Sequence, residues 1–111
     1  MYYVETSKSA AQDMREAVAY IAGKLHNLPA ANRLHDEADK AIFSLEEMPH
    51  RHPIVQDKHL ASLGFRFFPV RNYLVFYIVR EESKTVVIER FLYGKSDWAS
   101  ILKGDEISEN T

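Results

Sequence analysis

The sequence predicts an α+β domain in which a helical hairpin packs on one face of an antiparallel sheet. Two amphipathic helical stretches come first, and three closely spaced runs rich in Phe, Tyr, Val and Ile follow. A short strand at residues 2–6 precedes the helices, and a short helix at residues 96–102 follows the sheet. We therefore expect a single domain over residues 1–102 and a flexible polar tail over residues 103–111.

The two helices are indicated by apolar residues at three- and four-residue steps. Ser9 is expected to cap the first helix, whose apolar stripe runs to Leu25. Pro29 suits the first turn of the second helix, and Pro49 ends that helix after a stripe that runs to Met48. A joint of a few residues makes the pair an antiparallel hairpin, whose stripes must be buried against the sheet.

Three strands are predicted over residues 64–70, 73–79 and 85–93, because short polar joints separate these runs. The preceding segment, residues 49–63, is predicted to be an irregular connection. Strict alternation along the last strand places Arg90 on the same face as the apolar residues around it. Both faces of the last strands are fairly apolar, which is typical of a sheet with helices on one face and a partner on the other.

Composition excludes several classes of function. The chain has no cysteine, so neither a disulfide framework nor a thiolate zinc site is possible. No apolar run approaches the roughly 20 residues of a membrane span, and the first residues do not resemble a signal peptide. We expect a cytoplasmic protein with no membrane association and no cofactor or metal. Three histidines share a proline-containing segment, but their spacing does not bring them together: His50, His52 and His59.

Positive charge is concentrated on the predicted sheet. Residues 58–95 carry seven lysines and arginines against three acids, although the whole chain has a net charge of −2. The cations of this stretch are Lys58, Arg66, Arg71, Arg80, Lys84, Arg90 and Lys95. A small sheet with fixed positive charge is suited to bind a phosphate backbone or an acidic partner. The alternative is an ordinary solvated sheet face.

Some positions are candidates on their own chemistry. His59 lies just before the basic strand and is the best acid–base candidate. Lys95 follows Gly94 at a strand end, where functional groups are common. Arg66 alternates with phenylalanines and either binds an anion or is a surface cation. Trp98 either packs at the sheet edge or anchors an interface.

Two stretches of the predicted sheet carry a family resemblance. Residues 64–66 (GFR) and 71–77 (RNYLVFY) follow the order of a "YR" step, a turn and an "NYxVxY" strand. Residues 88–98 (IERFLYGKSDW) follow the order of an "IxRVLHGRRDW" closing strand. Together with the predicted topology, these stretches resemble the RelE/ParE superfamily of toxins from bacterial type II toxin–antitoxin pairs, over roughly residues 2–102.

The resemblance implies a growth-inhibiting protein that a cognate antitoxin neutralises. RelE-like members cleave messenger RNA on the ribosome, whereas ParE-like members poison DNA gyrase. RNA cleavage of this kind requires help for 2′-oxygen attack, a cation on the phosphate and an acid for the leaving oxygen. The candidate catalytic residues are Arg66, Arg71, Arg90, Lys95 and His59. The candidates for contact with the target or the antitoxin are Lys58, Tyr93 and Trp98.

Departures from the RelE-like pattern decide between the branches. Leu74 stands where RelE-like members place an arginine, and Tyr93 stands where they place a histidine. No Tyr or His follows Tyr93 to serve as a C-terminal acid. We therefore expect a ParE-like gyrase poison. The alternatives are a RelE-like, metal-independent mRNA endoribonuclease and an inactive toxin-fold module that only binds its antitoxin.

Overall fold

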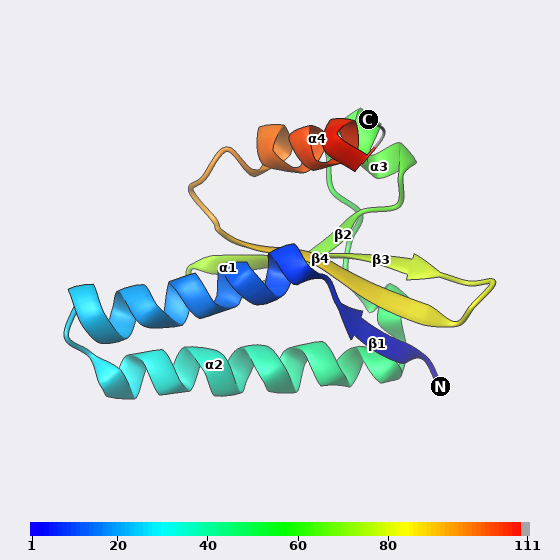
Figure 1. Ribbon diagram of the computed structural model, residues 1–111. Helices are drawn as coiled ribbons and strands as arrows, with labels where there is room; N and C mark the ends of the chain where they lie inside the picture. The colour runs from blue at the N-terminus through cyan, green and yellow to red at the C-terminus, as the bar shows by residue number, and fades with distance from the viewer. Residues whose placement is uncertain (110–111) are drawn as a thin grey trace.

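The computed structural model describes residues 1–109 and contains a four-stranded sheet with helices on both faces (Figure 1). Across the sheet the strand order is β1-β4-β3-β2, with β1 parallel to β4 and the other neighbours antiparallel. The predicted α+β fold, with an N-terminal strand, a helical hairpin and a three-stranded meander, is confirmed. The elements are β1 (Tyr3–Thr6), α1 (Lys8–Ala19), a π-helical turn η1 (Tyr20–Lys24), α2 (Leu28–Phe43), 3₁₀ turns η2 (Ser44–Glu46) and η3 (Pro49–Arg51), α3 (Lys58–Ser62), β2 (Arg66–Val70), β3 (Tyr73–Arg80), β4 (Thr85–Tyr93) and α4 (Trp98–Glu109).

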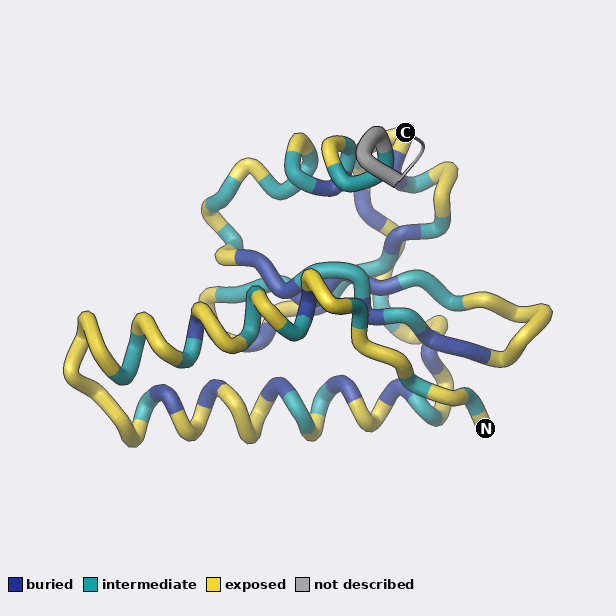
Figure 2. The backbone as a smooth tube through the Cα atoms, viewed as in Figure 1, coloured by how far each residue is buried: buried dark blue, intermediate teal, exposed yellow. Residues whose placement is uncertain are grey.

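The hairpin of α1 and α2 covers one face of the sheet, and the buried residues of α2 lie on the side toward the sheet (Figure 2). Small residues at the contact let the helices approach the strands closely. The helical side of this core comprises Ala10, Ala17, Leu34, Ala38, Ile42 and Leu45. The sheet side comprises Phe68, Val70, Val75, Tyr77, Val86, Ile88 and Phe91. Burial of this apolar surface is the main force that holds the hairpin on the sheet.

The ends of the hairpin helices differ from the predicted ones. The cap of α1 is Ser7, whose hydroxyl oxygen accepts from the backbone N–H of Ala10 at 3.0 Å, and Ser9 is an exposed residue inside the first turn. Leu25 and Met48, the predicted ends of the two apolar stripes, are 54% and 75% exposed. Met48 has left the helix and occupies the left-handed region, with φ of 52°.

The second face of the sheet is covered by the chain itself rather than by a partner. Helices α3 and α4 pack there, opposite the hairpin (Figure 1). Trp98 lies against Phe76 with ring centroids 5.1 Å apart. The buried residues of this second core are Val55, Leu60, Phe65, Phe76, Leu92 and Leu102. Both sheet faces therefore have a closed hydrophobic layer.

Two helical segments were not anticipated from the sequence. The segment predicted as an irregular connection contains α3, with Asp57 as its cap. Residues 103–111 were expected to be a flexible polar tail, and α4 continues into this segment as far as Glu109. Residues 110–111 lie outside the described part of the chain.

A β-bulge decides which face Arg90 occupies. Phe76 pairs with Arg90 but the next residue, Tyr77, pairs with Ile88, so β4 contributes one extra residue at this point. Beyond this point, the side chains of β4 therefore alternate between the two sheet faces with a shift of one residue. Ile88 and Phe91 both pack in the core under the hairpin, and Arg90 faces the other way. The prediction that Arg90 shares a face with Val86, Ile88 and Leu92 is therefore wrong for Val86 and Ile88, whereas Leu92 lies on the same face as Arg90.

The buried hydroxyl of Tyr77 provides a test of the core. It donates to the backbone oxygen of Pro49 at 2.6 Å, and burial raises the pKa of this phenol. Tyr77→Phe removes the donor and leaves a buried carbonyl without a partner, which we expect to lower the free energy of unfolding by about 1–2 kcal/mol. Urea denaturation measures the change. The control is Tyr3→Phe at a 75% exposed ring, and equal stability of Tyr77→Phe and the unmodified protein would contradict the interpretation.

Candidate functional site

Three arginines that were expected to form one positive surface, Arg66, Arg71 and Arg90, are engaged by separate partners. Arg66 donates from one guanidinium nitrogen to the backbone oxygens of His50 and His52, at 3.1 and 2.6 Å. It thereby fixes the segment before α3 against β2. This nitrogen is thus bonded to carbonyls of the chain itself. An anion could bind it only by breaking these hydrogen bonds.

Arg71 clamps the turn between β2 and β3 to the hairpin. It sits in the left-handed region with φ of 53° and donates two hydrogen bonds to Glu37 of α2, at 2.9 and 2.8 Å. Both side chains are about half exposed, so the pair contributes at most about 1 kcal/mol. The bidentate geometry nevertheless cancels the charge of this guanidinium at the surface.

Arg90 forms the most buried ion-pair network among the described residues. Its guanidinium donates to both carboxylate oxygens of Asp13 in α1, at 2.6 and 2.8 Å, and to Asp105 in α4, at 2.9 and 3.1 Å. Asp13 also accepts the backbone N–H of Phe91 at 3.0 Å. The hydrogen bonds that Arg90 donates to Asp13 are the main reason why the pKa of Arg90 is raised above its ordinary value. Arg90 thus joins both helical layers to β4.

The other predicted site residues are distributed over different surroundings. His59 lies 2.7 Å from Glu106 and links α3 to α4. Lys58 and Lys95 are exposed and make no ion pair with any side chain that the structure describes. Tyr93 is 45% exposed, whereas Trp98 is packed in the second core.

The five candidate catalytic residues are therefore not brought to a common acceptor. Arg66, Arg71, Arg90 and His59 each have a different partner, and Leu74 packs against the second core. The histidines separate as well, since His50 pairs with Glu81 at 2.7 Å. Within residues 1–109, no three His, Cys, Asp or Glu residues are placed to hold a metal ion, and no helix is long and apolar enough to cross a membrane.

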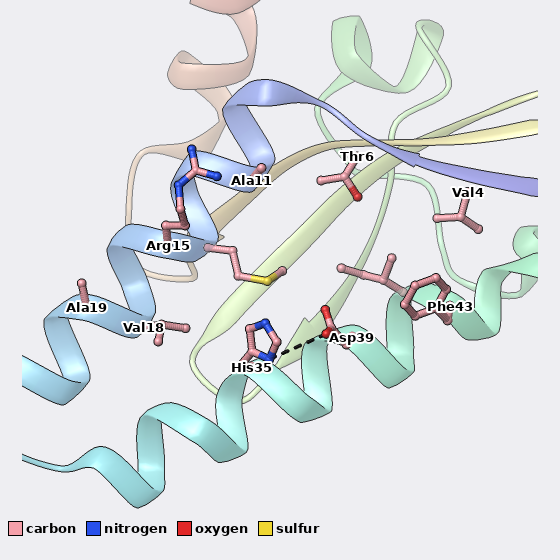
Figure 3. A pocket seen from close by; sticks show the side chains of 11 residues that line it. Val4, Thr6, Ala11, Arg15, Val18, Ala19, His35, Asp39 and Phe43 are labelled. Carbon is pink, nitrogen blue, oxygen red and sulfur yellow. Dashed lines mark ion pairs between the residues drawn. The ribbon is translucent and has the colours of Figure 1, made fainter.

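A groove that the sequence did not predict lies between the hairpin helices and β1 (Figure 3). We call it the hairpin groove. Its volume is about 470 Å³. Its apolar lining comes from Val4, Met14, Val18, Ile42 and Phe43. Its polar rim includes the pair of His35 and Asp39, 3.7 Å apart on α2. Because Phe43 is 61% exposed, this groove offers accessible apolar surface rather than a sealed core.

The hairpin groove borders the open edge of the sheet. Tyr3 and Ser7 direct their backbone N–H groups to carbonyls on the β4 side, each at 2.9 Å. At the start of this edge the N–H of Tyr2 donates outward to the oxygen of Glu46 in η2, at 3.0 Å. In a parallel ladder the alternate residues, Val4 and Thr6, then direct their N–H groups outward beyond this contact. The other edge strand, β2, is covered by the segment 53–55. The edge of β1 is therefore a place where a further strand can be added.

The fold is that of the RelE/ParE superfamily toxins, and comparisons with known proteins identify the family. The family model of the ParE toxin of type II toxin–antitoxin system, parDE, matches residues 4–98. The chain therefore belongs to the ParE toxin family. A chain of the chromosomal ParDE toxin–antitoxin system from P. aeruginosa superposes with a TM-score of 0.68 at 13% sequence identity, covering 84% of this chain and 96% of that one. No curated protein matches the sequence.

The Arg90 network predicts a strong coupling between distant residues. Arg90→Met leaves Asp13, whose side chain is 11% exposed, without its cation. We expect a loss of roughly 2–3 kcal/mol in the free energy of unfolding, because the remaining carboxylate is largely desolvated. Asp13→Leu is expected to cost a similar amount. The double variant should lose much less than the sum of the two single losses. Urea denaturation of the unmodified protein, both single variants and the double variant measures these free energies. Additive losses would show that the two residues do not interact.

His52 predicts how stability depends on pH. Burial lowers the pKa of His52 below its ordinary value of 6.5, and the charge of Arg51 lowers it further. The folded protein thus binds fewer protons than the unfolded chain just below pH 6.5. The contribution of neutral His52 to stability is complete above pH 6.5. It is lost as the pH falls from 6.5 through the lower folded-state pKa of His52. The denaturation midpoint of His52→Gln should fall less between pH 7.5 and 5 than that of the unmodified protein. An exposed histidine, changed in His26→Gln, is the control, and parallel profiles for His52→Gln and the unmodified protein would refute the prediction.

Proposed function

We propose that this chain is a growth-inhibiting toxin that a cognate antitoxin neutralises and that acts in the ParE manner, by trapping DNA gyrase on DNA. Membership of the ParE toxin family supports the toxin role. The observation that carries the choice of target is the internal pairing of Arg90 with Asp13 and Asp105. This pairing removes from solution the cation that an RNA-cleaving centre on the sheet would use.

The surroundings of the other candidates support the same choice. RNA cleavage requires a cation that is free to meet the phosphate and groups placed for proton transfer. Arg66 is bonded to backbone carbonyls, and Arg71 is neutralised by Glu37. Leu74 packs against the second core and supplies no charge. These arginines hold the chain's own elements together, which favours a toxin that acts by protein contact.

The hairpin groove and the edge of β1 support an antitoxin partner. An extended segment at this edge would accept and donate backbone hydrogen bonds at Val4 and Thr6. Its alternate side chains would enter the apolar lining around Ile42 and Phe43. The structurally similar P. aeruginosa chain comes from a ParDE toxin–antitoxin system, which is consistent with this partner. The second sheet face, already covered by α4, is not needed for the antitoxin.

Expression in bacteria tests the proposal. Induction of this chain alone should stop growth, and co-expression of its cognate antitoxin should restore growth. Purified protein added to gyrase and supercoiled DNA should accumulate cleaved gyrase–DNA complexes. The same protein added to programmed ribosomes should leave the message intact.

Each alternative has a distinct outcome. If the protein cleaves the message and Arg66→Ala abolishes this cleavage, the chain is a RelE-like ribonuclease rather than a gyrase poison. Tight antitoxin binding without growth arrest would indicate an inactive module. The proposal as a whole fails if high expression of the chain alone leaves growth unchanged.

A further inference from the structure

A small hollow with three tyrosines lies where α1 packs along β4. We call it the tyrosine site, and its volume is about 350 Å³. The residues that line it are Asp13, Glu16, Ala17 and Tyr20 from α1 and η1, Tyr73 from β3, and Phe91, Leu92 and Tyr93 from β4. The four helical residues follow one another by three, one and three positions, so they share one face of the helix. The hairpin groove uses the opposite face of α1 and shares no lining residue with this site.

The tyrosine rings surround a fixed floor. The ring of Tyr73 is stacked on Phe91 with centroids 5.0 Å apart and meets Tyr93 edge-on at 5.9 Å. Burial raises the pKa of Tyr73, and the nearby phenols of Tyr20 and Tyr93 raise it further. Tyr20 and Tyr93 are 52% and 45% exposed, so their rings are accessible to a partner. Within residues 1–109 none of the three hydroxyls makes a hydrogen bond, so their oxygens are free to accept one.

The charge at the tyrosine site is negative. Of the residues that line it, two are acids and none is a lysine or an arginine. Glu16 is exposed and accepts one hydrogen bond, from the neutral amide of Gln12 at 2.8 Å, and no described side chain gives it a cation. Asp13 is paired with Arg90, but that guanidinium also pairs with Asp105, so two carboxylates share one cation. An occupant therefore meets an unpaired carboxylate beside a network with excess negative charge.

The cations that are close in the sequence do not compensate this charge. Arg15 lines the hairpin groove instead. Arg71 lines an adjoining hollow at the hairpin tip, where it is held by Glu37. Lys24 and Lys95 do not line the tyrosine site. The site is thus complementary to a positive group from outside the chain.

We propose that the tyrosine site binds an arginine side chain of the toxin's protein target. This inference rests on the proposed toxin function and names the kind of side chain to which the toxin binds. A guanidinium is planar, so it stacks on a tyrosine ring while its N–H groups donate to carboxylate and phenol oxygens. Glu16 supplies the carboxylate, and Tyr20 and Tyr93 supply the exposed rings. A lysine would satisfy the charge but has no plane to stack.

The position of the site favours the target over the antitoxin as the source of this arginine. The antitoxin is proposed to occupy the hairpin groove, which lies on the opposite face of α1. A target that holds DNA carries arginines and lysines on the surface that meets the phosphates. Such a protein has the side chains that the site complements. A nucleic-acid strand does not, because Glu16 would repel its phosphates.

A soluble probe tests the chemistry of the site without the target. N-acetyl-arginine amide is titrated into isotope-labelled protein and followed by NMR, and N-acetyl-citrulline amide, which has the same shape without the charge, is the control. We expect arginine to shift the amide signals of Tyr20, Tyr73 and Tyr93 with a dissociation constant in the millimolar range, and citrulline to bind at least about tenfold more weakly. Glu16→Gln should weaken arginine binding by about tenfold. Glu47→Gln, at an exposed carboxylate outside the site, should leave it unchanged. Equal responses to the two probes, or no shifts at the tyrosines, would overturn the proposal.

Growth arrest tests the role of the site in the cell. Tyr93→Leu removes an exposed ring, and Glu16→Arg places a like charge where the arginine would bind. We expect each variant to reduce arrest by at least about tenfold in colony counts, while antitoxin affinity stays within about threefold of the unmodified chain. Glu47→Arg is the matched control and should keep full arrest. Circular dichroism and thermal melting check folding, and Glu16→Arg, at an exposed helix position, carries the test if Tyr93→Leu does not fold.

The outcomes separate this inference from the proposed function. Full arrest by both Tyr93→Leu and Glu16→Arg overturns the tyrosine site and leaves the toxin function standing. If Glu16→Arg weakens antitoxin binding and keeps the arrest, the antitoxin is the occupant and the assignment to the target is wrong. A dimer of the unmodified chain that Glu16→Arg separates in analytical ultracentrifugation would instead make a second copy the occupant. An unmodified chain that does not arrest growth overturns the toxin function and the target together, whatever the arginine titration shows.

Discussion

The guanidinium of Arg90 holds together three elements that are far apart in the sequence. Through Asp13 it fixes α1 on one face of the sheet, and through Asp105 it fixes α4 on the other. This bridge depends on the bulge after Ile88, which turns Arg90 out of the core beneath the hairpin. Without the extra residue, the charge would enter that apolar core, where no pairing of similar quality would offset its desolvation.

Ion pairs within the chain limit the ability of the sheet to bind an anionic ligand. A guanidinium that is paired with a carboxylate binds a phosphate only by giving up that partner, and the carboxylate then repels the phosphate. Arg71 and Arg90 are both in this position. The count of cations over the meander therefore overstates the field that a ligand meets. A partner is therefore recognised more by shape than by charge, at the apolar surfaces beside β1 and at the hairpin tip.

The elements with long periodic patterns were predictable, and the details that depend on single residues or on distant contacts were not. The two helices and the meander follow from hydrophobic spacing. The face that Arg90 occupies could not be predicted in this way, because one inserted residue reverses the alternation of side chains. Its partner Asp13 also lies 77 residues away in the sequence. Helix α3 is too short for a periodic pattern. The polar end of α4 is held by contacts that no local pattern shows, such as Lys103 with Asp57 at 2.7 Å.

One helix serves both apolar surfaces. Met14 and Val18 line the hairpin groove, whereas Ile21 and Leu25, the next members of the same stripe, line a second hollow between η1 and the ends of β3 and β4. A π turn adds a residue to the helical repeat and rotates the side chains that follow it, so the stripe divides at Tyr20. An antitoxin segment confined to the groove would leave the hollow open.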